Sequence, residues 1–159
     1  MKPSVRLVSG VAILSSLAIM VAHGVARGEV ARLSASQEGK VAQDTRSFAG
    51  ANGESVPVEM RAVLTTRQKA VDLIMHGDRV DSDDSAILVL ARGHFIGYQM
   101  EQPPQVASAS GPPKGDVLLI VYDARTGRLL DWTLRDTMRG DRLPNLPSLG
   151  AVTSLAPSN

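Results

Sequence analysis

Apolar residues recur at helical spacing in the segment between residues 55 and 77. Six of them fall on one face of an α-helix: Met60, Val63, Leu64, Ala70, Val71 and Ile74. Thr65 followed by Gln68 fits a capping box, so the pattern predicts one amphipathic helix, most strongly over residues 66–76. Residues 56–64 also alternate between apolar and other side chains, and a short edge strand leading into a helix capped at Thr65 stays open as the alternative.

An unbroken apolar run at residues 86–91 predicts a strand buried on both faces. Continued alternation beyond the run places Phe95 on one face and Arg92, His94 and Tyr98 on the other. The two glycines within this stretch indicate a bulge or a close approach of another part of the chain.

A Pro-rich loop at residues 100–116 separates this strand from a predicted β-hairpin. The hairpin consists of a two-sided apolar strand at 117–122, a turn at 123–127 that ends in Gly, and a returning strand at 128–134. The returning strand places three apolar side chains on one face: Leu130, Trp132 and Leu134.

Near the carboxyl terminus an apolar residue occurs at every third position: Leu143, Leu146, Leu149, Val152 and Leu155. Pro144 and Pro147 oppose a helix here. The spacing therefore predicts an extended, polyproline-like strap along the domain surface, with a disordered tail as the alternative.

The amino terminus has the layout of an export signal. Two basic residues precede an uncharged, mainly apolar run at residues 7–22, and small residues follow it. We therefore predict a signal peptide at residues 1–26, or an uncleaved membrane anchor, and a protein that is extracellular or in the cell envelope. Residues 27–55 are polar and rich in small residues, so we predict a flexible linker there.

Charge and cysteine content restrict the possible partners. Seventeen Lys and Arg balance sixteen Asp and Glu, so we predict no nucleic-acid partner, and membrane contact only through residues 7–22 if they are retained. The absence of Cys excludes a disulfide framework, a thiolate metal site and a cysteine nucleophile.

The sequence contains no recognised catalytic motif: it has no G-x-S-x-G elbow, no P-loop and no G-x-G-x-x-G turn. His76 and His94 do not have the spacing of a metal site. The acidic residues at 78–84 lack the turn glycine and distal glutamate of an EF-hand loop, so a solvated turn is favoured and cation binding stays open. We predict a protein that is not an enzyme and has no cofactor and no metal site.

Several short motifs resemble those of small exported bacterial proteins of uncharacterised function: Gly93-His94-Phe95, the double-Pro loop, Asp123-Ala124-Arg125-Thr126-Gly127, and Leu146-Pro147-Ser148-Leu149-Gly150. The likeness covers residues 58–152. The order of a helix, strands and this hairpin is also similar to PepSY-type domains, which are found in peptidase propeptides and extracytoplasmic sensory or regulatory proteins. Neither resemblance brings functional residues with it.

Together these patterns predict an α+β domain at residues 56–155, with one amphipathic helix packed on an antiparallel sheet of three or four strands. The predicted function is an exported, noncatalytic binding or regulatory module. It would engage an unknown protein or peptide through Arg92, His94 and Tyr98 on a sheet face and through the Pro-rich loop. A small-molecule or metal-binding sensor using His94 is the alternative, followed by a small hydrolase.

Overall fold

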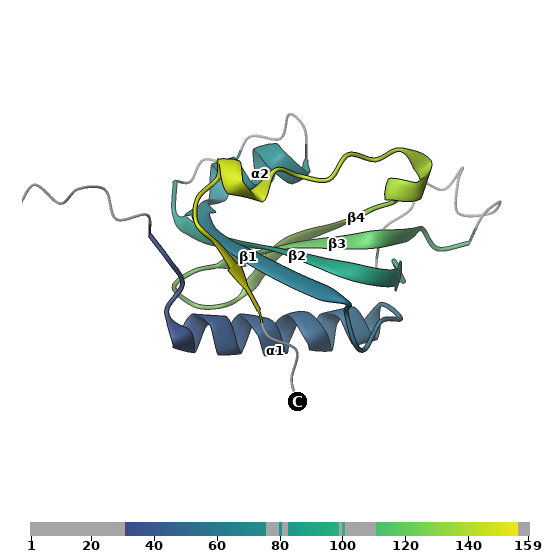
Figure 1. Ribbon diagram of the computed structural model, residues 1–159, viewed down its shortest axis with the longest axis horizontal. Helices are drawn as coiled ribbons and strands as arrows, with labels where there is room; N and C mark the ends of the chain where they lie inside the picture. Colours follow the sequence, from purple (N-terminus) through teal and green to yellow (C-terminus); the bar gives the residue numbers. More distant parts are fainter. Residues whose placement is uncertain (1–30, 76–79, 81–82, 99, 101–110, 156–159) are drawn as a thin grey trace, which may run out of the picture.

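Five strands of the described chain form one antiparallel sheet with a helix on each face (Figure 1). The computed structural model describes residues 31–75, 80, 83–98, 100 and 111–155. In chain order the elements are α1 (Ala35–Ala51), β1 (Glu59–Thr66), α2 (Arg67–Ile74), β2 (Ser85–Ile96), β3 (Lys114–Asp123), β4 (Leu129–Arg135), the 3₁₀ turns η1 (Thr137–Arg139) and η2 (Leu146–Ser148), and β5 (Val152–Ser154). The strand order is β4-β3-β2-β1-β5. The predicted α+β class is confirmed, with two helices instead of one and more strands than predicted.

Helix α1 shows that the prediction of a flexible linker at residues 27–55 is wrong over Ala35–Ala51. Ser34 begins the helix with a capping box, in which Gln37 N donates to Ser34 Oγ and Ser34 N donates to Gln37 Oε1. The buried face consists of small residues spaced three and four apart: Val41, Ala42, Thr45 and Ala49. Such a face is weakly apolar, which is why its periodicity is faint in the sequence.

The chain between residues 56 and 74 is a strand followed by a helix, so the second of the two predicted alternatives is correct. The helix is capped by Thr66, whose hydroxyl accepts from Lys69 N at 3.4 Å, and not by Thr65. β1 lies between β2 and β5, so it is not the predicted edge strand.

β2 is the central strand and confirms the prediction of burial on both faces. Residues 86–91 are at most 1% exposed. Ile87, Val89 and Phe95 pack in a core beneath α1, on what we call the α1 face of the sheet. Leu88 and Leu90 pack in a second core with α2, on the α2 face. Figure 1 shows the two helices on these opposite faces.

Two bulges change which way side chains point. The β2–β3 register shifts between Arg92 and Phe95, as the glycines predicted. A Cβ atom on Gly93 would lie 2.5 Å from Glu54 Cγ, so any larger residue here would displace the Glu54 side chain. The β3–β4 register shifts next to Leu130, which packs on the α2 face.

The hairpin is confirmed, but the predicted grouping of its apolar side chains is wrong. Because of the second bulge, the α1 face receives Leu129 with Trp132 and Leu134 instead of Leu130.

The predicted loop at 100–116 ends earlier than expected, because Lys114 already begins β3. Residues 101–110 of that loop lie outside the described residues.

The carboxyl-terminal strap crosses from one face of the sheet to the other. Leu146 in η2 is 1% exposed in the core under α2, and Leu155 is 4% exposed in the core under α1. Figure 1 shows this segment, in yellow, passing from the α2 side to the α1 side. The strap along the domain surface is therefore observed, but its regular structure is the 3₁₀ turn η2 and the strand β5 and not a polyproline helix.

A buried hydroxyl pair joins α1 to the sheet, and its disruption is a testable consequence of the fold. Tyr122 Oη lies 3.1 Å from Thr45 Oγ1, and both residues are at most 1% exposed. We expect Tyr122→Phe to lower the free energy of unfolding by about 1–3 kcal/mol, because it leaves the Thr45 hydroxyl buried without a partner. In the double variant with Thr45→Val, urea unfolding should show that most of the lost free energy of unfolding is recovered. A further loss of stability in the double variant would contradict this assignment.

The same pair gives a signature at alkaline pH. Burial raises the pKa of Tyr122 to about 12 against the opposing hydrogen bond with Thr45. Because the folded pKa exceeds the unfolded value near 10, this contribution to stability is fully present below about pH 10 and is lost as the pH rises towards 12. The Tyr122→Phe variant should lack this component of the loss.

Candidate functional site

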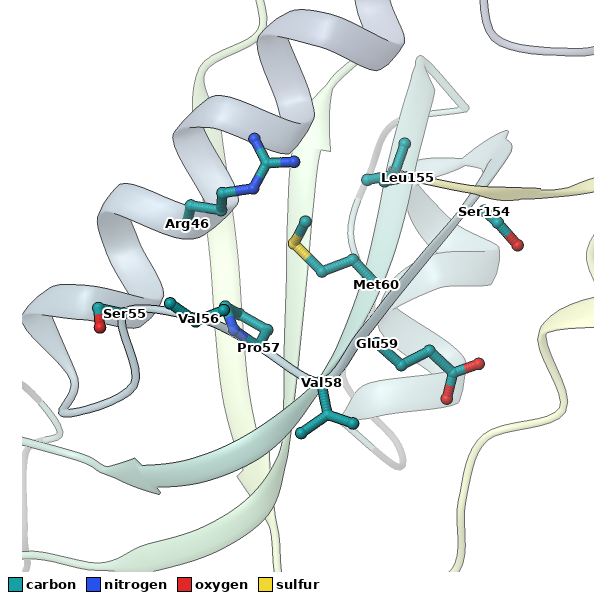
Figure 2. Close-up of a pocket in the computed structure, with 9 residues that line it drawn as sticks. All are labelled: Arg46, Ser55, Val56, Pro57, Val58, Glu59, Met60, Ser154 and Leu155. Atoms are coloured by element: carbon teal, nitrogen blue, oxygen red, sulfur yellow. The ribbon is translucent and has the colours of Figure 1, made fainter. Parts of the chain in front are cut away.

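A groove of about 350 Å³ lies between α1 and the start of β1 (Figure 2). Its lining comes from α1, the segment before β1, the first two residues of β1, and the end of β5 with the residue after it: Arg46, Ser55, Val56, Pro57, Val58, Glu59, Met60, Ser154 and Leu155. Met60 and Leu155 are 5% and 4% exposed, so the inner part of the groove is apolar. Figure 2 shows Met60 directed towards α1 and Arg46, with Val56 and Pro57 to one side and Leu155 to the other.

The groove exists because β5 covers only part of β1. β5 pairs with three residues of β1: Arg61, Ala62 and Val63. Beyond them, Leu155 N donates to Met60 O at 2.9 Å. Pro57 precedes β1 and has no N–H to offer a strand partner. On either side of this proline, Val56 and Val58 are 72% and 84% exposed, so two apolar side chains stand in solvent at the rim of an apolar groove.

A second depression of about 450 Å³ adjoins the groove. Its lining is more polar: Val58, Glu59, Arg92, Gly93, His94, Asp116 and Met138. Val58 and Glu59 line both hollows, so they form the ridge between them. The two hollows therefore make one surface, apolar on the α1 side of the ridge and charged on the other.

The charged side contains both signs. Arg92 is in register with Glu59 on β1. Partial burial acts to raise the pKa of Asp116, but hydrogen bonds from the Thr137 hydroxyl and backbone N–H, together with the positive charge of Arg92, outweigh it and hold that pKa below its usual value. The Glu59 carboxylate itself lies 2.9 Å from Arg61 Nε, so Asp116 is the carboxylate on which the charge of Arg92 acts. A negative charge is thus already present near Arg92, which makes this depression a poor site for a free anion.

Glu54 fixes the bulge at the same end of β2. Its Oε2 accepts from the backbone N–H of His94 at 3.1 Å and lies 3.8 Å from His94 Nδ1. The His94 side chain itself is 96% exposed, whereas that of Glu54 is 20% exposed. Glu54 thus sets the direction of the strand, and His94 stands in solvent at the rim of the depression.

The structure brings together two of the three binding residues predicted from the sequence. Arg92 and His94 line the same depression. Tyr98, which is 60% exposed, does not line it, because β2 ends at Ile96 and the bulge interrupts the alternation that would carry all three to one face. Addition of a peptide strand to β2 is also excluded, since β2 is paired on both sides.

The apolar groove was not among the sites predicted from the sequence. Its signal was present as Val56 and Val58 on either side of Pro57, but this spacing equally fits a strand with one buried face. The groove depends on where β5 ends beside β1, and that contact joins parts of the chain about 90 residues apart.

No group of three or more His, Cys, Asp or Glu side chains able to hold a metal ion occurs in the described part of the chain. His76 and two of the four acidic residues at 78–84, Asp78 and Asp81, lie outside that part. Within it, no helix has the length and apolar character needed to cross a membrane. Residues 1–26, where we predict the export signal, are outside the described ranges.

Comparison with known proteins finds no family model, no curated protein and no solved structure that matches this chain. The resemblances to exported bacterial proteins and to PepSY-type domains stay predictions.

Proposed function

We propose that the protein is an exported, noncatalytic binding module that holds an extended, apolar segment of a protein or peptide in the groove beside β1. The observation that carries the proposal is the exposure of Val56 and Val58 next to the buried side chains of Met60 and Leu155. Exposed aliphatic residues at the rim of an apolar hollow are typical of interaction sites. Export rests on the charge pattern of residues 1–26.

The shape of the groove favours an extended ligand. β5 already lies antiparallel along β1, and within the described residues its pairing ends near Met60, beside the groove. A ligand segment that follows the same line would cover Val56 and the inner apolar surface, which is how strand-like peptides bind beside sheet edges. Burial of apolar area would supply most of the affinity.

The neighbouring depression adds a requirement on the ligand. A segment that passes over the ridge at Val58 meets Arg92, His94 and Asp116. Unpaired charge is costly to desolvate, so this part of the ligand should be polar and remain partly hydrated. The ligand class is therefore an extended peptide with an apolar stretch followed by polar residues.

Selection from a phage-displayed library of random peptides tests this proposal. We expect the selected peptides to share an apolar stretch and to bind as synthetic peptides in fluorescence anisotropy. The double variant Val56→Ser with Val58→Ser should raise the dissociation constant about tenfold or more, because it removes two apolar contacts and leaves the core intact.

Arg92→Ala is the matched control, since it alters the depression and leaves the groove unchanged. We expect it to change the dissociation constant by less than about threefold, as is usual for an exposed charge at a rim. Loss of binding in Arg92→Ala together with full binding in the valine variant would move the site to the depression predicted from the sequence.

A further inference from the structure

The outer edge of β4 has no strand partner among the described residues, because β4 is the last strand on its side of the sheet. Every residue of Leu129–Arg135 is half-buried. An open edge with apolar side chains is a template for pairing with another strand. This edge lies at the opposite side of the sheet from the groove beside β1.

Hydrogen bonding across the hairpin determines which backbone groups face outwards along this edge. Asp123 N donates to Arg128 O across the hairpin, and the N–H and C=O groups of alternate residues point to opposite sides of a strand. Past the bulge at Leu130, the backbone groups of Trp132 and Leu134 therefore point away from β3. Consistently, Trp132 N donates to the side chain of its neighbour Asp131 at 2.7 Å instead of to β3.

The side chains of β4 are segregated between the two faces. Asp131, Thr133 and Arg135 are in register with buried residues of the α2 face. Trp132 and Leu134 lie on the α1 face, where the Trp132 ring packs edge-on against Phe48 at a centroid distance of 5.0 Å. Past the bulge, over residues 131–135, the edge thus has a polar side with one acid and one base, and an apolar side with an aromatic ring.

We propose that two copies of this chain associate through antiparallel pairing of their β4 edges, with a two-fold axis at Thr133. In this register Asp131 of each copy lies opposite Arg135 of the other, so two ion pairs form. Trp132 of each copy lies opposite Leu134 of the other, which makes two aromatic–aliphatic pairs of the kind that stabilise sheets. The two sheets then form one continuous sheet across the axis.

Both charge and backbone geometry select this register. Centring the axis on Thr133 pairs the outward-facing backbones of Trp132 and Leu134, as antiparallel hydrogen bonding requires. It also places Asp131 and Arg135 in non-hydrogen-bonded positions, where opposing side chains lie closest. An axis at Trp132 would instead place Asp131 opposite Thr133, and an axis at Asp131 would place two like charges opposite each other.

The association is expected to be reversible and weak. The Asp131 carboxylate must release Trp132 N–H, which then donates to Leu134 of the second copy. Arg135 Nη2 donates to Ile74 O at 2.6 Å, and the other N–H groups of the guanidinium can pair with Asp131 of the second copy. A short strand pair of this kind buries little area, so the dissociation constant should be micromolar. Each copy keeps its groove beside β1 open.

Sedimentation equilibrium over a concentration series tests the proposal on the chain as recovered after expression, with its intact mass measured. We expect a monomer–dimer equilibrium. Asp131→Arg and Arg135→Asp should each raise the dissociation constant about tenfold or more, because each turns two attractive pairs into repulsive ones. The double variant restores opposite charges and should return the dissociation constant to within about threefold of the original.

Thr133→Lys is a further variant, and it leaves the hydrogen bond from Arg135 to Ile74 O in place. It puts two like charges opposite each other at the two-fold axis. It should also raise the dissociation constant about tenfold, whereas Gln43→Lys on the exposed face of α1 should not. A chain that stays monomeric at millimolar concentration overturns the proposal. So does a dimer that is unaffected by all three single changes in β4, because that dimer must use another surface.

Discussion

Val41→Asp is expected to lower the free energy of unfolding by about 3 kcal/mol or more, the largest effect we foresee for a single substitution. Val41 is 1% exposed and lies between α1 and the sheet. A carboxylate there must either lose its hydration or separate the helix from the core. Since domains of this size are stable by only about 5–15 kcal/mol, the transition midpoint in urea should fall strongly.

Gln43→Asp is the matched control, because it adds the same charge two residues away on the exposed side of the same helix. We expect a change within about 0.5 kcal/mol. If residues 27–55 were a flexible linker, both variants would have the stability of the unchanged protein. Equal unfolding curves for the two would therefore contradict the role of α1 in the fold.

The central strand and the hairpin could be predicted because their signals are local. Residues 86–91 form an uninterrupted apolar run, and the turn at 123–127 has Asp123 accepting from Arg125 N and Thr126 N, with Gly127 at a φ of 70°. Such signals depend on neighbouring residues alone. They would be visible in almost any context.

Helix α1 was missed because its buried face contains mainly alanine and threonine. Ala49 is fully buried and Thr45 is held by Tyr122, which lies 77 residues further along the chain. Small residues let the helix lie close to a sheet that is itself rich in Val, Leu and Ile, but they leave almost no apolar periodicity in the sequence. The capping pair of Ser34 and Gln37 was the available local signal.

The candidate site was predicted in part for a related reason. Strand alternation is a local signal, and two of the residues that it placed together, Arg92 and His94, line one depression. Tyr98 does not line it, because β2 ends at Ile96, and that end depends on the bond from Ile96 N to Asn52 O. The groove depends on the contact between β5 and β1. Both contacts are long-range, and nothing in the neighbouring residues reveals them.

The two edges of the sheet differ in how they are protected from pairing with a further strand. On the β1 side, β5 covers part of the edge and leaves the proposed peptide groove beside Val56 and Val58. On the β4 side, the half-buried strand is covered within the described residues by side-chain contacts of its own: Trp132 N donates to Asp131 Oδ1, and Thr133 Oγ1 donates to Leu134 O. Natural sheets normally protect such edges from uncontrolled pairing. Controlled pairing in one register is consistent with the charges on β4.

The carboxyl-terminal strap supplies the second large prediction. Leu146→Ala should lower the free energy of unfolding by about 2–5 kcal/mol, because Leu146 is 1% exposed in the core under α2 and its removal leaves a cavity. The measurement is urea unfolding followed by far-UV circular dichroism. A lower urea midpoint with an unchanged m value would show that the substitution lowers the stability of the folded state and leaves the surface exposed on unfolding unchanged.

Leu143→Ala makes the same chemical change in the same strap at a residue that is 44% exposed, and we expect it to cost less than about 0.5 kcal/mol. The contrast separates the two arrangements that the sequence allows. In a disordered tail, both leucines would be equally dispensable. In the folded strap, Leu146 fixes η2 against α2, and η2 in turn leads the chain to β5 and the open end of the groove. Equal effects of the two substitutions would show that the strap does not hold β5 in place.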